Sequence, residues 1–107
     1  MNEEIARLRT EFTKNGLSEN QVSADPFEQF KVWFNDSVTS GVHEPNAMNL
    51  STVAENGRPT SRIVLLKGMD EQGFTFFTNY NSTKGQNLLH FPYAALTFFW
   101  TDLERQV

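Results

Sequence analysis

The sequence contains no cysteine, so disulfide bonds cannot contribute to its stability. Its two histidines, His43 and His90, lie too far apart to form a short metal-binding motif. No apolar run approaches the roughly 20 residues that cross a bilayer, and the amino terminus is acidic where a signal peptide is basic. These absences predict a cytoplasmic protein without a structural metal or a membrane segment.

An excess of positive charge is also missing. Nine Lys and Arg residues stand against thirteen Asp and Glu residues, which gives a net charge of −4 at pH 7. Such a chain has no general attraction for nucleic acid or an anionic membrane, so any phosphate site must be local. The sequence also has no glycine-rich phosphate loop, no dinucleotide fingerprint and no evident Ser-His-Asp order. Hydrolase and nucleotidase functions are therefore not favoured.

Phenylalanine, by contrast, is abundant, with ten among the 107 residues. Aromatic side chains can fill a small core or line a site for a planar ligand, and composition leaves both uses open. A chain of this length fits one domain, which can bury about two thirds of the surface that its unfolded form exposes.

Two helices are predicted in the amino-terminal part. Residues 2–14 repeat apolar side chains at spacings of three and four, which is typical of one helical face. A second helix begins at Asp25-Pro26-Phe27-Glu28, where Asp25 can cap the helix and Glu28 can complete a capping box, and it ends at Gly41. We expect its apolar stripe to pack on a sheet: Phe27, Phe30, Trp33, Phe34 and Val38.

The rest of the chain predicts mainly strands. Asn56-Gly57 is a strong hairpin signal, so the first two strands are antiparallel, and a third completes a meander. Ser82 can cap a short helix through Leu89, which Pro92 ends. The predicted strands cover residues 48–54, 60–67, 74–79 and 94–101, with a fifth starting at Leu103. Such an order favours an antiparallel barrel or curled sheet with flanking helices, left open by four or five strands.

Two cations, Arg62 and Lys67, bracket four aliphatic residues of the second strand. One interpretation is a central strand whose cationic ends reach solvent. The other is a phosphate site, because the planar fork of Arg can hold two phosphate oxygens while Lys offers a movable point charge. Alternation puts the two side chains on opposite faces, so they can share one site only through a bulge, a strong twist or a second subunit.

A second polar segment, residues 77–84, runs from a strand into a helix start. Unpaired N–H groups there, with the hydroxyls of Thr78, Ser82 and Thr83 and the ammonium of Lys84, could bind a phosphate. The alternative is an ordinary helix cap at Ser82 beside a solvated lysine. No acid–base pair is evident, since Asp102 and Glu104 are expected to be solvated.

Six blocks of the sequence together resemble the pyridoxamine 5′-phosphate oxidase family: LRTEFTKNGL, ADPFEQFKVWF, EPNAMNLSTV, GRPTSRIVLLKG, FTFFTNYNSTKGQNL and LERQV. The resemblance implies a split β-barrel that binds flavin mononucleotide (FMN) between two subunits. Because the family continues through further strands, residues 1–107 are expected to form the amino-terminal part of one incomplete barrel domain. Residues 1–24 would be a helix and arm, and residues 25–107 a helix with barrel strands.

The resemblance also implies which residues bind ligands, although it assigns no catalytic residue. The expected FMN contacts are Arg62, Ile63, Val64, Leu65, Leu66, Lys67, Phe77, Thr78, Thr83, Lys84 and Gln106. The expected substrate contacts are Lys67, Arg9, Thr10, Glu11 and Phe12.

Some of these positions depart from the family pattern. Thr10 replaces an arginine, Phe12 and Phe77 replace tyrosines, and Thr83 stands where an arginine commonly binds the flavin phosphate. The loss at Thr83 is the most serious, because a charge-assisted phosphate contact contributes about 1.5 to 3 kcal/mol.

The implied activity is oxidation of pyridoxine or pyridoxamine 5′-phosphate to pyridoxal 5′-phosphate, with molecular oxygen as the final oxidant. The alternative is a non-catalytic module of the same fold that binds flavin or a vitamin B6 phosphate. A homodimer is expected, because half a barrel leaves strand edges, and the apolar faces around Phe98 and Trp100, without cover.

Overall fold

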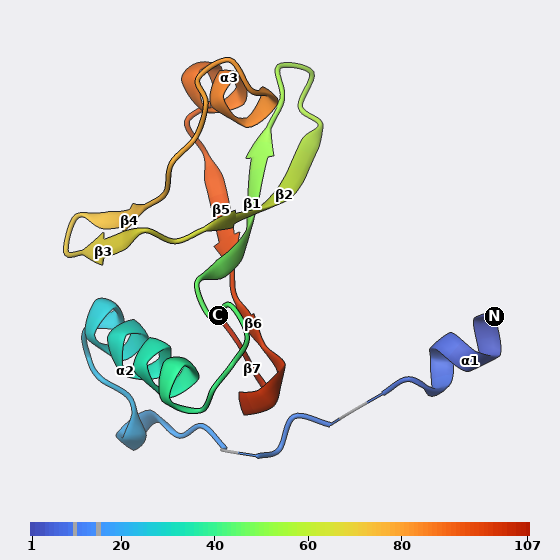
Figure 1. The fold of residues 1–107 in the computed structure, drawn as a ribbon, viewed down its shortest axis with the longest axis vertical. Helices are drawn as coiled ribbons and strands as arrows, with labels where there is room; N and C mark the ends of the chain where they lie inside the picture. The colour runs from blue at the N-terminus through green and yellow to red at the C-terminus, as the bar shows by residue number, and fades with distance from the viewer. Residues whose placement is uncertain (10, 15) are drawn as a thin grey trace.

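The computed structural model describes residues 1–9, 11–14 and 16–107. Short antiparallel strands with flanking helices make up the fold, and the strands of the described residues do not close a barrel (Figure 1). The expected fold class, mainly β with an incomplete split barrel, is confirmed. The elements are α1 (Asn2–Arg7), η1 (Glu19–Gln21), α2 (Pro26–Thr39), β1 (Ala47–Val53), β2 (Pro59–Leu65), β3 (Gly68–Asp70), β4 (Gly73–Thr75), α3 (Thr83–His90), β5 (Ala94–Thr97), β6 (Phe99–Trp100), η2 (Thr101–Leu103) and β7 (Arg105–Gln106).

The β1–β2 hairpin forms where Asn56-Gly57 predicts it. Gly57 has a φ of 83°, a left-handed conformation that costs glycine little, and its N–H donates to the carbonyl of Ala54. The register pairs Leu50 with Arg62 and Thr52 with Thr60. We call the face that carries these four residues the inner face of the sheet.

The predicted meander is wrong in its third strand. A meander would place the third strand beside β2, but the sheet has the order β2-β1-β5, so β1 is central and β2 lies at an edge. The chain after β2 instead forms the separate hairpin β3–β4, and residues 76–79 are not a strand. Among the described strands β4 pairs with β3 alone, and the chain then leaves toward α3 (Figure 1).

The predicted fourth strand is divided between two partners. Its first part, β5, pairs with β1, and its last part, β6, pairs with β7. Phe98 lies between the two parts. Its N–H donates to the carbonyl of Val107 at 2.8 Å, and its carbonyl accepts the N–H of Val107 at 3.1 Å. A short fifth strand therefore exists, although it begins at Arg105 rather than Leu103.

Phe30 of α2 lies at the centre of the apolar core. Its ring centroid is 5.1 Å from those of both Phe74 and Phe98 and 6.2 Å from that of Trp100. Phe98 and Trp100 are 2% and 1% exposed, so α2 covers them within one chain. The apolar stripe of α2 thus packs on strands as expected, except for an exposed Val38.

The first helix is shorter than predicted. It ends at Arg7, and no residue of it is buried. An isolated helix of this length gains little stability without a packing partner. Phe12, expected on the same helical face, instead stacks on Phe99 with ring centroids 6.0 Å apart. No helix among the described residues has the length and apolarity to span a membrane.

Asp25 caps α2 as predicted, since its Oδ1 accepts the N–H of Phe27 at 2.9 Å. The expected capping box does not form. The Glu28 carboxylate pairs with Lys31 at 3.1 Å, and the N–H of Asp25 donates to Ser23 Oγ at 3.2 Å. Ser23, rather than Glu28, therefore accepts the backbone N–H of the capping residue Asp25.

This difference predicts unequal effects of two substitutions. Asp25→Ala should lower the free energy of unfolding by about 1 kcal/mol, because it removes the acceptor for a helix N–H group. Glu28→Ala should leave that free energy nearly unchanged, because its pair with Lys31 is solvent-exposed. Urea denaturation measures both, and equal losses would indicate that the capping box forms in solution.

Candidate functional site

Arg62 lies in a polar cluster on the inner face of β1 and β2. Its Nη1 donates to the carbonyl of Leu50 at 3.1 Å and to Thr52 Oγ1 at 2.9 Å, and its Nη2 donates to Thr60 Oγ1 at 2.6 Å. These acceptors are neutral, and Arg62 forms no ion pair within the described residues. A half-buried positive charge is therefore held in place without being compensated.

The hydrogen-bond count of Arg62 shows which part of it can bind a ligand. A guanidinium has five N–H donors, and three of them bind the acceptors named above. Nε–H and one Nη2 hydrogen have no acceptor among residues 1–9, 11–14 and 16–107. These two lie side by side on one edge, which matches two oxygens of a phosphate.

Helix α3 docks on the same cluster. Asn87 of α3 donates from Nδ2 to Thr52 Oγ1 at 3.2 Å and to Thr60 Oγ1 at 3.1 Å. We call Leu50, Thr52, Thr60, Arg62 and Asn87 the Arg62 cluster. Figure 1 shows α3 at the end of the β1–β2 hairpin, where this contact places it.

The first turn of α3 is held by its own loop. Ser82 Oγ accepts the N–H of Gly85 at 3.2 Å, which confirms the predicted cap. A Cβ atom at Gly85 would lie 2.5 Å from the carbonyl oxygen of Asn79 and 2.9 Å from that of Tyr80. Glycine therefore allows the loop to pack against the helix start, beside a half-buried Lys84.

The other residues expected near α3 are more open. Thr78 is half-buried, with its Oγ1 3.4 Å from Ser82 Oγ. Phe77 is 74% exposed and Thr83 is exposed. These side chains are available to a ligand at this end of the sheet.

The rest of the expected FMN segment alternates along β2 and just beyond it. Val64 and Leu66 point toward the core, while Ile63, Leu65 and Lys67 are exposed. The register of β2 is one-to-one with β1, so no bulge brings Lys67 to the face of Arg62. Lys67 instead borders a cavity of about 360 Å³ between α2 and β3, which Phe30, Phe34 and Met69 also line.

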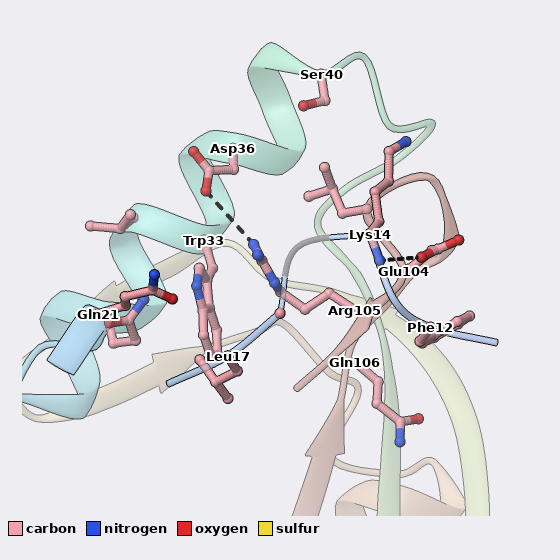
Figure 2. A pocket seen from close by; sticks show the side chains of 14 residues that line it. Phe12, Lys14, Leu17, Gln21, Trp33, Asp36, Ser40, Glu104, Arg105 and Gln106 are labelled. Atoms are coloured by element: carbon pink, nitrogen blue, oxygen red, sulfur yellow. Dashed lines mark hydrogen bonds and ion pairs between the residues drawn. The ribbon is translucent and has the colours of Figure 1, made fainter. Parts of the chain in front are cut away.

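Gln106 belongs to a different cavity, of about 670 Å³, between α2, the arm and the carboxyl-terminal hairpin (Figure 2). Arg105 crosses it, with its guanidinium carbon 4.8 Å from the Trp33 ring centroid and Nη1 3.7 Å from Asp36 Oδ2. Gln106 itself is exposed. In Figure 1, β7 and α3 lie at opposite ends of the structure.

Glu104 has a role that the sequence did not reveal. It was expected to be solvated, but its Oε2 accepts the N–H of Thr13 at 3.0 Å and that of Lys14 at 2.7 Å, and Figure 2 shows the bond to Lys14. Lys14 Nζ also donates to the carbonyl of Asp102 at 2.9 Å. These partners are about 90 positions apart, so no local pattern could have indicated them.

The expected substrate residues lie on the arm. Arg9 and Glu11 form an exposed ion pair at 2.8 Å, and Phe12 rests on Phe99. Arg9, Phe12 and Phe99 border a cavity of about 470 Å³. Thr10 lies outside the described residues.

Comparison with known proteins identifies the chain. The family described as pyridoxamine 5′-phosphate oxidase matches residues 34–107. The chain belongs to this family. Proteins named pyridoxine/pyridoxamine 5′-phosphate oxidase match from Ectopseudomonas mendocina, at 55% identity over 109 residues, and from Nostoc punctiforme, at 54% over 107. Both alignments cover 100% of this chain but only 51% and 50% of those relatives, so the chain spans about half their length.

Two solved structures share the fold of this oxidase-family chain. PhzG from Burkholderia lata, determined with tetrahydrophenazine-1-carboxylic acid, superposes with a TM-score of 0.80 at 26% identity, covering 86% of this chain and 46% of PhzG. A pyridoxamine 5′-phosphate oxidase-related, FMN-binding protein from Nostoc punctiforme gives a TM-score of 0.60 at 25% identity, covering 73% and 41%.

The polar residues expected to bind FMN in this oxidase-family chain therefore fall into three places, whereas Ile63 and Leu65 lie on the face of β2 opposite Arg62. Arg62, Thr78, Thr83 and Lys84 are near the junction of α3 with the β1–β2 hairpin, Lys67 is beside α2, and Gln106 is near the arm. The sequence did not indicate Thr52, Thr60 or Asn87. The signal available for the two threonines was their place opposite each other across the Asn56-Gly57 turn.

Proposed function

We propose that this chain forms the amino-terminal half of an FMN-dependent oxidase that converts pyridoxine or pyridoxamine 5′-phosphate to pyridoxal 5′-phosphate. The observation that carries the proposal is Arg62, whose uncompensated guanidinium keeps one edge with two donors available. Membership of the oxidase family supports it, as do the names of its relatives.

The residues around Arg62 fit the phosphate of FMN. Lys84 adds a second cation in the first turn of α3, where N–H groups without helical partners and the helix dipole favour an anion. Thr83 can add a hydroxyl there, although it carries no charge. The fit thus depends on two cations from two elements, Arg62 and Lys84.

Arg62 and Lys84 would hold FMN, which would supply the two-electron oxidation at C4′ of the vitamin, with molecular oxygen as the final oxidant. The chain's own task is to hold the two reactants in register, since correct orientation can lower a barrier by about 7 to 11 kcal/mol. We assign flavin contacts to Ile63, Leu65 and Phe77, which are exposed. We assign the substrate to Lys67 and to the arm residues Arg9, Glu11 and Phe12.

A homodimer would unite the separated site residues. Lys84 belongs to α3 and Gln106 to β7, and these elements lie at opposite ends of the folded structure (Figure 1). A second copy could therefore supply Gln106 to a cofactor held at Lys84. The apolar faces around Phe98 and Trp100 no longer motivate the dimer, because α2 buries them. Among the described residues, one apolar surface without cover is the outer face of β2, where Ile63 is 66% exposed and Leu65 is 37% exposed.

FMN binding tests the phosphate assignment. The protein should bind FMN more tightly than riboflavin, and Arg62→Ala should weaken FMN binding about tenfold or more while leaving riboflavin binding unchanged. Titration followed by flavin fluorescence measures both constants. Arg58→Ala is a control, because Arg58 is exposed beside the hairpin turn. Equal affinities for the two flavins would show that the phosphate ligands are wrongly assigned.

Sedimentation at several concentrations tests the dimer. The protein should sediment as two copies, and Ile63→Glu should shift it toward monomer because the new charge would be buried in the interface. Val38→Glu, at an exposed aliphatic residue of α2 (51% against 66% for Ile63), should not. A compact monomer throughout would count against a shared cofactor cleft.

Turnover separates an enzyme from a binding module of the same fold. With FMN added, the sequence continued to the length of its relatives should produce pyridoxal 5′-phosphate. Residues 1–107 alone should be at least about a hundredfold slower, because half a site holds the vitamin loosely. Comparable rates would show that residues 1–107 contain a sufficient site, and no turnover by the longer chain would favour the binding module.

A further inference from the structure

Asn87 is a buried amide in the middle of α3, with 9% of its surface exposed. Its bonds to Thr52 and Thr60 are the only side-chain hydrogen bonds between α3 and the β2-β1-β5 sheet in the part of the chain that the structure describes. A buried amide without partners is costly, so this pair of bonds favours one position of α3 on the sheet.

The two hydroxyl groups that bind Asn87 are also those that bind Arg62. Thr52 Oγ1 accepts from Arg62 Nη1 at 2.9 Å and from Asn87 Nδ2 at 3.2 Å. Thr60 Oγ1 accepts from Arg62 Nη2 at 2.6 Å and from Asn87 Nδ2 at 3.1 Å. The two hydroxyl oxygens also lie 3.2 Å from each other, so Thr52, Thr60, Arg62 and Asn87 form one hydrogen-bonded network. The amide and the guanidinium hold the hydroxyls from two sides.

Asn87 also affects where Lys84 stands. Residues three apart lie on the same face of a helix, so Lys84 is on the face of α3 that Asn87 docks on the sheet. A shift of α3 would change the distance between Lys84 and Arg62, and two cations bind one phosphate well only at a suitable separation.

We propose that Asn87 is a positioning residue for phosphate recognition. It does not contact the phosphate. It holds the two threonine hydroxyls that orient Arg62, and it keeps α3 docked so that Arg62 and Lys84 reach the same anion. This inference rests on the proposed function, in which those two cations bind the phosphate of FMN.

The experiment measures the affinities for FMN and riboflavin of the sequence continued to the length of its relatives. Asn87→Leu keeps the side-chain size and removes both hydrogen bonds, so FMN binding should weaken about tenfold while riboflavin binding stays unchanged. Thr60→Val, which removes one shared hydroxyl at nearly constant shape, should act in the same direction. Because Thr60 also binds Arg62 directly, Asn87→Ala, which removes the same two Asn87 hydrogen bonds, decides the question if Asn87→Leu fails to fold.

Two further variants distinguish positioning from stability. Ser37→Ala removes a buried hydroxyl of α2 that donates to the carbonyl of Phe34 at 2.6 Å, far from the Arg62 cluster in the chain. It should lower stability without changing the ratio of the two flavin affinities. Arg62→Ala combined with Asn87→Leu should lose less FMN affinity than the two single losses multiplied together, because both act on one cluster.

The outcomes separate this inference from the proposed function. If Arg62→Ala leaves the ratio of FMN to riboflavin affinity unchanged, the phosphate assignment is wrong, and the proposed role of Asn87 is then wrong as well. If Arg62→Ala lowers the ratio but neither Asn87→Leu nor Thr60→Val does, only the role of Asn87 is wrong. Equal weakening of FMN and riboflavin by Asn87→Leu would show a purely structural residue and would also overturn the inference.

Discussion

The β1–β2 hairpin pairs Leu50 with Arg62 and Thr52 with Thr60, and the Arg62 cluster depends on that register. A slip of one residue would turn Arg62 to the outer face and bring Ile63 inward, because neighbouring side chains of a strand point to opposite faces. In the observed register the guanidinium meets two hydroxyls and a carbonyl, which orient it without cancelling its charge. Orientation without neutralisation is what an anion site requires.

The inner face changes in character along the hairpin. At one end, Met48 is part of the apolar core around Phe30, and Val64 packs against that core. At the other end, Thr52 and Thr60 bind Asn87 of α3. One sheet thereby fixes α2 at one end and α3 at the other (Figure 1). Lys67, which lies beside α2, and Lys84, which belongs to α3, are consequently held apart within one chain.

Local features were predictable where neighbouring residues decide them. Asp25, Ser82 and the Asn56-Gly57 turn act within a few positions of themselves, and each behaves as expected. The predictions that failed concern competition between alternative partners. Ser23 rather than Glu28 accepts the N–H of Asp25, and the third strand pairs with β3 rather than with β2.

The sequence by itself determined the family, the alternation that separates Arg62 from Lys67, and the residue types available for a phosphate. Those follow from order and periodicity along the chain. Tertiary structure alone decided that Asn87 would share two hydroxyls with Arg62 and that Glu104 would bind the backbone of Thr13 and Lys14. Such contacts join residues from 27 to 91 positions apart, and only the packing of whole elements brings them within hydrogen-bond distance.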